Sequence, residues 1–401
     1  MPSIRTRRIT RLAVALFASL FALILAKPLP LTAFAQSSSP VEQGKFILHK
    51  FEQPIGEETY QITRDGESLN AKIDFKFTDR STPVPLTATF HSARDWTPQS
   101  FEIKGKNSRA TDIDDTVEVQ PGKIRLRDRD KWTESPRPAQ FFTIAGYAPA
   151  TMQMLLVRYW ARHGSPSQLA TVPRGQVKVE PRGSDTLSIG EKDQKLDRFT
   201  IEGLIWGRET LWFDADHNLV AAVTTDAEFD HFEAIREGYE SAMGTFVGLA
   251  ASDEMAALAD ISKGISGSRA EKIALVGGTL IDGTGRNPVP DSVVVIEKGR
   301  IVDAGPKSRV KIPGGAQKVD ARGKTILPGL WDMHAHFEQV EWGPIYLAAG
   351  ATTVRDCGNE FEFITAVRDA VAKGRGLGPR LLLAGIVDGT GPSAIGVAHG
   401  R

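Results

Sequence analysis

The stretch "ILPGLWDMHAHF" (Ile326–Phe337) decides how the C-terminal part of the chain is interpreted. Two of the chain's eight histidines, His334 and His336, stand one residue apart in it, after an apolar run. Successive side chains of a β-strand point to opposite faces. We therefore predict a strand on which Asp332 and both histidines share one face, while the other face is apolar and packs under helices.

Two imidazoles at this spacing suit a metal ion. Neutral imidazoles a few ångströms apart can bind one divalent cation together, zinc above all, and a bound metal lowers the pKa of water to about 7. An H-x-H pair can also be structural, so the pair alone leaves both interpretations open. The histidines earlier in the chain are scattered, and we interpret them as ordinary surface or satisfied core residues. They are His49, His91, His163, His217 and His231.

The first 35 residues have the composition of an export leader. Four arginines precede an uncharged run, Leu12–Ala26, and Ala33-Phe34-Ala35 fits the small-residue rule of signal peptidase. The run is shorter than the roughly 20 residues that span a bilayer, which disfavours an uncleaved membrane anchor. We expect cleavage near Ala35 and export to the periplasm or the medium, with twin-arginine export as a minor alternative.

Charge and cysteine content argue against nucleic-acid binding and against a disulfide-stabilised fold. Removing the leader's five basic residues from the total of 49 leaves a mildly acidic chain, which has no electrostatic footprint for nucleic acid. The hydrophobic fraction of 41% and the charged fraction of 24% are those of a globular protein. A single cysteine, Cys357, excludes an internal disulfide, so stability must come from packed cores.

Residues 36–265 are predicted to form an antiparallel, β-rich domain of unknown role. Short alternating runs are separated by turns, and Asp65-Gly66 is a strong hairpin signal. One helix is predicted over residues 149–164, where methionine and aromatic side chains recur on one face. A linker, Ser262–Arg269, then marks the main domain boundary.

The pattern changes after the linker. Residues 271–329 are predicted to form a small β unit of short strands joined by turns. From residue 330 to residue 401, apolar strands alternate with a helix, which indicates a parallel α/β layout.

The order of these segments resembles the opening of the amidohydrolase superfamily, in the branch of imidazolonepropionases and prolidase-like dipeptidases. The resemblance lies within residues 271–401 and is carried by "LVGGTLIDGTG", "VVIEKGRIVDAG", "ILPGLWDMHAHF" and "LAAGATTVRDCG". It implies a multidomain chain. Residues 271–329 would belong to a composite β-sandwich, and residues 330–401 would begin a (β/α)8 TIM barrel.

The resemblance also implies roles for four residues. His334 and His336 would be ligands of a divalent metal, with zinc as the expected ion. Asp332 would support these ligands from the same face. Asp356, at the C-terminal end of the second barrel strand, would either reach the pocket or cap the strand end, and both alternatives stay open. No catalytic residue is assigned.

The chain is expected to hold only the start of such a barrel. Residues 330–401 number 72, whereas a complete barrel takes about 250. Two histidines are fewer than the three protein ligands of a catalytic zinc site. The family's further ligands and its general base come from later strands. We therefore expect the chain as given to be incomplete and inactive.

Three functions are compatible with the sequence. The first is a fragment of a secreted, metal-dependent amidohydrolase that hydrolyses the C–N bond of a cyclic amide, another non-peptide amide or a dipeptide through a metal-bound hydroxide. The second is a non-enzymatic envelope protein that binds a ligand or partner and carries a vestigial barrel segment. The third is a structural or assembly role. None of them involves nucleic acid or, after leader cleavage, a stable membrane span.

Overall fold

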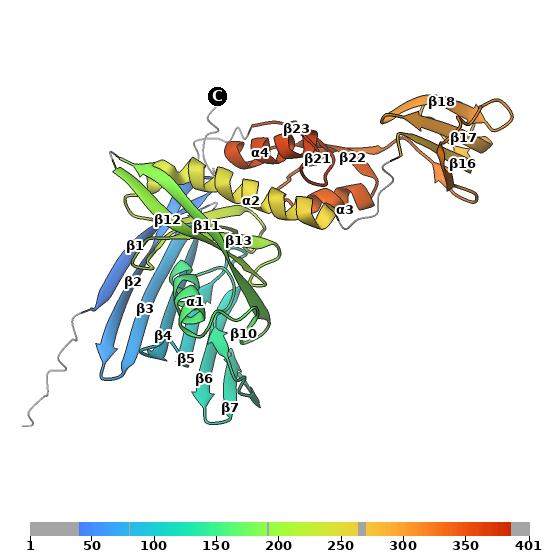
Figure 1. Ribbon diagram of the computed structural model, residues 1–401. Helices are drawn as coiled ribbons and strands as arrows, with labels where there is room; N and C mark the ends of the chain where they lie inside the picture. Colours follow the sequence, from blue (N-terminus) through green and yellow to red (C-terminus); the bar gives the residue numbers. More distant parts are fainter. Residues whose placement is uncertain (1–39, 80, 191, 264–269, 386–401) are drawn as a thin grey trace, which may run out of the picture. The chain divides into compact units, whose positions relative to one another are not determined.

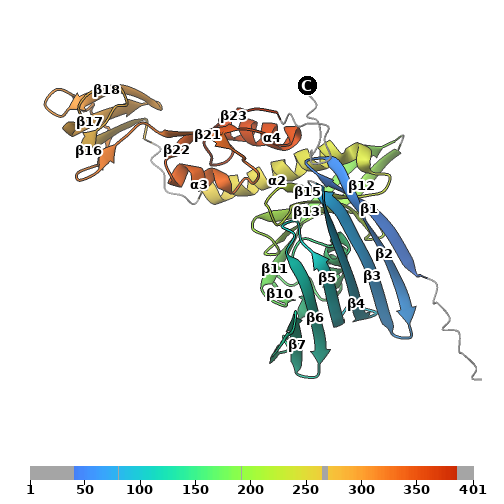
Figure 2. The ribbon, with the colours of Figure 1, turned by 180° about the vertical axis from the view of Figure 1, so that it is seen from behind.

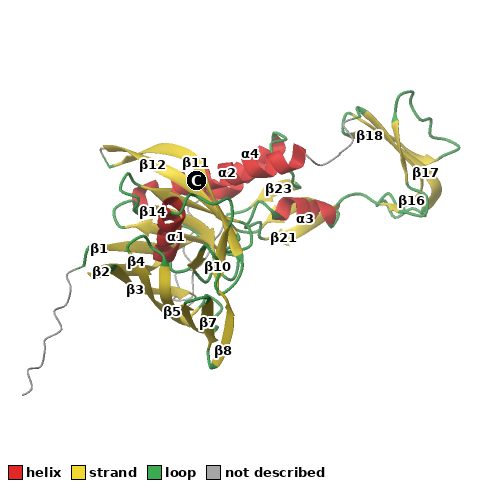
Figure 3. Ribbon diagram, turned by 60° about the horizontal axis from the view of Figure 1, so that its bottom comes forward, coloured by secondary structure: helices red, strands yellow, loops and turns green. Residues whose placement is uncertain are grey.

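The computed structural model describes residues 40–385, with the exception of residues 80, 191 and 264–269. The predicted leader and the end of the chain from residue 386 lie outside the described residues, as does most of the predicted linker. The described part is β-rich, with three sheets and few helices (Figures 1 and 3).

The N-terminal strands form one large sheet. They are β1 (Glu42–Lys50), β2 (Gln53–Asp65), β3 (Ser68–Asp79), β4 (Thr82–Ala93), β5 (Pro98–Lys106), β6 (Asp112–Gln120), β7 (Lys123–Asp128), β8 (Lys131–Pro136), β9 (Phe141–Thr143), β10 (Leu169–Val172), β11 (Gln176–Ile189), β12 (Lys192–Glu202), β13 (Arg208–Phe213), β14 (Leu219–Thr225) and β15 (His231–Arg236). The order runs from β8 down to β1 and then from β15 down to β9. Two runs of neighbouring strands therefore meet where β1 pairs with β15 (Figure 2).

Alternation of apolar and polar residues accounts for these strands. In β3, every second side chain from Leu69 to Phe77 is buried, and the side chains between them are half-buried or exposed. The predicted hairpin is confirmed, because Asp65 pairs with Ser68 in antiparallel register and Gly66 in the turn has a φ of +56°. Glycine adopts this left-handed conformation without steric cost. The predicted antiparallel pairing is confirmed for all neighbours in the described sheet except β9 and β10, which run parallel.

The predicted helix is α1 (Ala150–Arg162), which packs into the apolar core of the large sheet. Its first N–H groups have no partners within the helix. Glu58 of β2, which is fully buried, accepts hydrogen bonds from the N–H of Ala150 at 2.7 Å and of Thr151 at 2.8 Å. A carboxylate at this position also opposes the positive end of the helix dipole. The start of α1 is thus fixed by a side chain from a distant strand.

A second, smaller sheet lies within residues 271–329. Its strands are β16 (Lys272–Leu280), β17 (Val289–Glu297), β18 (Arg300–Pro306), β19 (Gln317–Asp320) and β20 (Thr325–Ile326). The order is β18-β17-β16-β19, and β20 also pairs with β16. Three buried valines, at positions 293, 295 and 310, form its core.

The third sheet is parallel. It contains β21 (Leu330–Ala335), β22 (Ala351–Asp356) and β23 (Arg380–Leu383), in that order. The helices α3 (Trp342–Ala348) and α4 (Phe361–Ala372) connect the strands. Both pairs of neighbours run parallel, so the predicted α/β layout is confirmed for these residues.

One prediction about β21 is wrong. We expected its apolar face to pack under helices, but Trp331 is 55% exposed and Met333 is 48% exposed. Only the last part of that face is buried, at Ala335 and Phe337. The reason is the placement of the helices, since α3 contacts β22 and α4 contacts β23.

One apolar core joins the large sheet to the parallel sheet. Between them lie a 3-10 helix, η1 (Glu240–Ala242), and α2 (Met243–Lys263). Trp212 of the large sheet contacts Phe246 of α2, with ring centroids 4.9 Å apart. The same core continues to Phe363 of α4, and all of these residues belong to one compact unit, Ser38–Arg401. In the described part of the chain, no helix has both the length and the apolar character needed to cross a bilayer.

Glu209 of β13 carries a buried carboxyl group whose contribution to stability depends on pH. Gln153 donates to its Oε1 at 2.9 Å and Thr224 donates to the same atom at 2.8 Å. Burial raises the pKa of Glu209 from 4.5 to about 7. A carboxyl group with a raised pKa stabilises the folded state fully below its unfolded pKa, and this contribution is lost as the pH rises through the folded pKa.

We expect Glu209→Gln to remove this dependence, because the amide is neutral at every pH and its oxygen can accept the same two hydrogen bonds. Between pH 5 and pH 8, the free energy of unfolding of the native protein should fall by about 2–3 kcal/mol relative to that of the variant. Urea unfolding at both pH values measures the difference. The same pH dependence in both proteins would contradict the assignment.

Candidate metal site

His334 and His336 lie side by side at the end of β21. The strand ends at Ala335, so His336 is the first residue beyond it. The ring centroids are 5.7 Å apart with an angle of 60° between the ring planes. Side chains on opposite faces of a strand diverge, so this separation places both rings on one side of the chain. Asp332 accepts a hydrogen bond from the N–H of His334 at 3.2 Å, a contact within the strand.

The ring of His336 is oriented by the main chain. Its Nδ1 lies 3.3 Å from the carbonyl oxygen of Gly358, within hydrogen-bonding distance. When Nδ1 carries the proton and donates to that oxygen, Nε2 presents its lone pair. Histidine ligands of metals are commonly oriented by such a bond. The arrangement suits His336 as a ligand through Nε2.

Asp356 holds the loops at the ends of β21 and β22. Its fully buried carboxylate accepts hydrogen bonds from the N–H of Phe337 at 2.7 Å and of Gly358 at 3.0 Å. The side-chain amide of Asn359 donates to it at 3.2 Å. These bonds fix the segment that carries His336. The strand-end interactions of Asp356 are thus observed, and a role in a substrate pocket stays a prediction.

Within the described residues, no third histidine, cysteine or carboxylate joins the pair to make a group of three possible ligands. Two such groups occur elsewhere. One consists of His231, Glu233 and Glu360, and the other of Asp79, Asp226 and Glu228.

Sequence analysis missed the first of these groups. His231 was interpreted as an ordinary surface or core residue; its ring is buried, its Nδ1 lies 3.0 Å from Glu360, and by strict geometry neither ring nitrogen has a hydrogen-bond partner among the described residues. The available signal was spacing, since His231 and Glu233 alternate on β15 as His334 and His336 do at β21. Glu360 gave no comparable signal, because its proximity depends on the tertiary fold.

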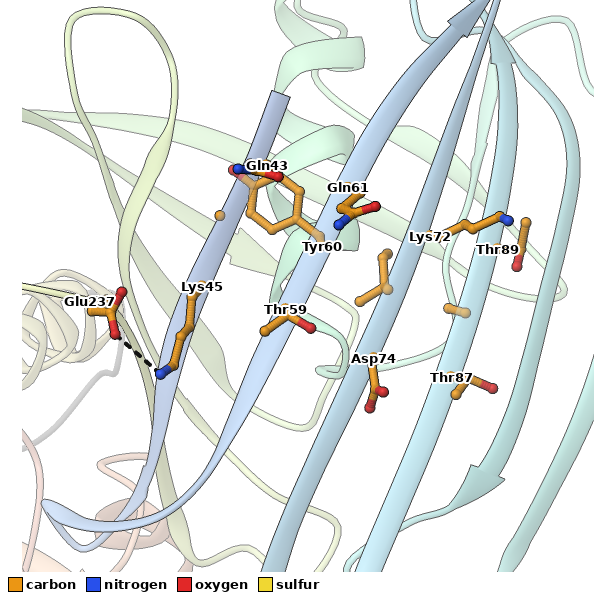
Figure 4. A pocket seen from close by; sticks show the side chains of 13 residues that line it. Gln43, Lys45, Thr59, Tyr60, Gln61, Lys72, Asp74, Thr87, Thr89 and Glu237 are labelled. Carbon is orange, nitrogen blue, oxygen red and sulfur yellow. Dashed lines mark ion pairs between the residues drawn. The ribbon is translucent and has the colours of Figure 1, made fainter. Parts of the chain in front are cut away.

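A separate hollow lies on the large sheet. It has a volume of about 680 Å³ and is lined by side chains of β1 to β4 (Figure 4). The lining is mainly polar and includes Gln43, Thr59 and Lys72. Lys45 forms an ion pair there with Glu237 at 3.1 Å. None of the residues that line the hollow belongs to the parallel sheet, so it is not part of the histidine site.

Comparison with known proteins gives partial matches. No family model matches the chain. Over 67 residues it is 39% identical to a 5-methylthioadenosine/S-adenosylhomocysteine deaminase of Symbiobacterium thermophilum. Over 85 residues it is 38% identical to an allantoinase of Solibacter usitatus. This chain is related to the amidohydrolase superfamily.

The relationship to the amidohydrolases is limited to part of the chain. The two matches cover 16% and 19% of it, and the chain spans 15% and 17% of the length of these relatives. Among solved structures, a molinate hydrolase is 36% identical, with a TM-score of 0.29 and coverage of 31% of this chain and 32% of that one. The two sequence matches confirm the predicted resemblance as a relationship over part of the length.

We expect Asp356→Ala to lower the free energy of unfolding by about 3 kcal/mol, because it leaves buried N–H donors without an acceptor. Asp332→Ala is the matched control. It removes a half-buried carboxylate with one contact inside its own strand, so its cost should stay below about 1 kcal/mol. Urea unfolding of both variants tests the difference. Equal costs would show that the hydrogen bonds of Asp356 do not hold the loop.

Proposed function

We propose that this chain forms the beginning of an exported, metal-dependent amidohydrolase that hydrolyses a C–N bond in a small molecule. The substrate class is a cyclic amide, another non-peptide amide or a dipeptide. The observation that carries the proposal is the pair of imidazoles, His334 and His336, whose centroids lie 5.7 Å apart at the end of the first parallel strand. The partial relationship to amidohydrolases supports it.

The position of the pair supports a barrel site. The proposal treats β21, β22 and β23, with α3 and α4, as the first strands and helices of a (β/α)8 barrel. Active sites of such barrels lie at the C-terminal ends of the strands. His336 follows the last residue of β21, and Asp356 is the last residue of β22. The proposed domains are residues 36–265, 271–329 and 330–401.

The residues present fit a metal ligand pair. The carbonyl oxygen of Gly358 can hold the Nδ1 proton of His336, which leaves Nε2 for the ion. His334 and His336 would hold the ion, with zinc as the proposed metal. An ion there would supply Lewis acidity and activate water. Catalytic zinc sites use three protein ligands, so the proposal requires further ligands from outside the described residues.

Export is part of the same proposal. It is supported by the four arginines, the uncharged run and the Ala33-Phe34-Ala35 sequence of the first 35 residues. Mass spectrometry of the exported protein should show a new N-terminus near residue 36.

A cavity in the large sheet favours a second candidate function. It has a volume of about 270 Å³ and is lined by aromatic side chains that include Tyr147, Trp206 and Phe229. Small-molecule sites are typically concave and mostly apolar, of about 300 Å³ and more. The alternative is a non-enzymatic envelope protein that binds a small apolar ligand there and uses its parallel sheet for structure only.

The test compares the 401-residue chain with a form extended to the full length of the relatives. We expect the 401-residue chain to release no product from a panel of cyclic amides, non-peptide amides and dipeptides, because its two histidines leave an ion under-coordinated. The extended form should turn over one class of the panel. His334→Ala should lower that turnover by at least about 100-fold.

His217→Ala is the matched control, because His217 is an exposed histidine in a turn of the large sheet. It should leave turnover unchanged. Turnover by the 401-residue chain would contradict the proposal, and so would full activity of the extended His334→Ala protein.

A further inference from the structure

Three ionisable side chains meet in the interior where β15 adjoins α4. His231 and Glu233 lie two residues apart on β15 and therefore share a face. Glu360 immediately precedes α4. The Nδ1 of His231 is 3.0 Å from an oxygen of Glu360, and one ligand atom of each of the three side chains lies within 4.8 Å of the others. None of the three residues is more than 4% exposed.

Most polar atoms of this triad lack a well-formed hydrogen bond. By strict geometry, neither ring nitrogen of His231, neither carboxylate oxygen of Glu360 and not Oε1 of Glu233 has a hydrogen-bond partner among the described residues. Their close contacts are with one another, at 3.0 Å between His231 and Glu360, and with the backbone of Glu338. The other oxygen of Glu233 accepts the N–H of Glu52 at 3.2 Å, which aims Oε1 at its neighbours. Buried polar atoms are almost always hydrogen-bonded in native proteins. The number of buried polar atoms here without a well-formed hydrogen bond favours a bound ligand.

A neighbouring cluster shows buried carboxylates that share a cation from the chain itself. The Nζ of Lys50, a fully buried residue, lies within 3.6 Å of four carboxylates. The distances are 2.6 Å to Asp79, 3.3 Å to Asp226, 3.6 Å to Glu228 and 2.6 Å to Asp230. Within the described part of the chain, no lysine or arginine forms an ion pair with Glu233 or Glu360. The two carboxylates of the triad therefore lack the kind of cation that contacts the four carboxylates around Lys50.

Protons offer one solution to this excess of charge. Burial raises the pKa of Glu360 to about 8 and that of Glu233 well above its usual value, so these carboxyl groups can be neutral. Protonation removes the charge. It does not give the ring nitrogens of His231 a hydrogen bond that meets strict geometric criteria, although Nδ1 lies 3.0 Å from Glu360 and the backbone of Glu338 interacts with the ring. It therefore accounts for only part of the arrangement.

A divalent cation accounts for the whole arrangement. Two carboxylates and a neutral imidazole balance its charge, and nitrogen and oxygen donors suit zinc and its first-row neighbours. Ligand atoms around a tetrahedral zinc ion lie about 3.4 Å apart. The observed 3.0 Å between His231 and Glu360 and the 4.8 Å limit for all three side chains bracket that value.

A small cavity adjoins His231, although neither Glu233 nor Glu360 lines it. The cavity has a volume of about 20 Å³ and is lined by His231, Glu338 and Phe363, among other residues. A volume of this size is sufficient for one water molecule.

We propose that His231, Glu233 and Glu360 bind a divalent transition-metal ion of the zinc class, and that this ion ties β15 of the large sheet to α4 of the parallel sheet. The site is structural and separate from the histidine pair at β21. It does not depend on the proposed function.

The test uses the 401-residue chain with His334→Ala and His336→Ala, so that the pair at β21 cannot contribute. After removal of metal with a chelator, the protein is titrated with Zn²⁺ and with Co²⁺. We expect one ion per chain, a visible Co²⁺ absorption band, and a higher Tm with metal, since a ligand that binds only the native state stabilises it. Absence of binding in this double variant would overturn the proposal.

Glu360→Gln and Glu233→Gln, each added to the double variant, should weaken Zn²⁺ binding by at least about 100-fold and abolish the metal-dependent rise in Tm. Glu209→Gln is the matched control, because Glu209 is also fully buried but its Oε1 accepts two hydrogen bonds. It should keep the full affinity. An equal loss in Glu209→Gln and Glu360→Gln would also overturn the site.

The titration of the double variant decides the question even where a glutamine variant fails to fold. Failure of the amidohydrolase proposal would be seen in a different measurement, the turnover assay. It would appear as full activity of the extended His334→Ala protein, while the triad still binds its ion.

Discussion

The apolar core shared by the large sheet, α2 and α4 is the constraint on which the C-terminal part of the structure depends. Three parallel strands with two helices have little interior of their own. Phe246 and Phe363 belong to one buried cluster, together with Trp212 of the large sheet. Burial of each such side chain contributes about 1.5–3 kcal/mol, so a few of them outweigh most single polar interactions in the molecule. The parallel sheet is stable where it is covered in this way, and its uncovered start at Trp331 remains exposed.

The same packing removes polar groups from water at the junction. The side-chain NH2 group of Gln339 is paired there, because it donates to the carbonyl oxygen of Trp206 at 2.7 Å and to the hydroxyl of Thr225 at 3.1 Å. Lys50 forms ion pairs with four carboxylates and offsets part of their charge. The triad at His231 differs from the Lys50 cluster because, among the described residues, no lysine or arginine forms an ion pair with its two carboxylates. Burial in the apolar core thus favours binding of a ligand at this site. Because two of the three side chains are carboxylates and the third is an imidazole, the favoured ligand is a cation.

Much of the fold could be predicted because its signals are local. The turn at Asp65-Gly66 can be predicted because glycine readily adopts the positive φ that the turn requires. Helix α1 can be predicted because apolar residues recur along one side of it. The parallel layout after residue 330 follows from short apolar strands that alternate with a helix. The exposure of Met333 could not be predicted, since alternation shows that a face is apolar but not whether a helix covers it. The two alternatives for Asp356 also required coordinates, because its donors come from the ends of two strands.

The two histidine sites share one local feature, the i, i+2 spacing that places two side chains on the same face of a strand. At His334 and at His231, a residue two positions away presents a second ligand atom on the same side of the chain. At β21 the pair is exposed, so water satisfies the imidazoles and no ion is needed for the fold. At β15 the surroundings are dry, and the cost of leaving charged or polar atoms unpaired is several kcal/mol for each ion. The same i, i+2 spacing therefore permits a metal at β21 and favours one at β15. The difference is burial, which the spacing of residues in the sequence does not show.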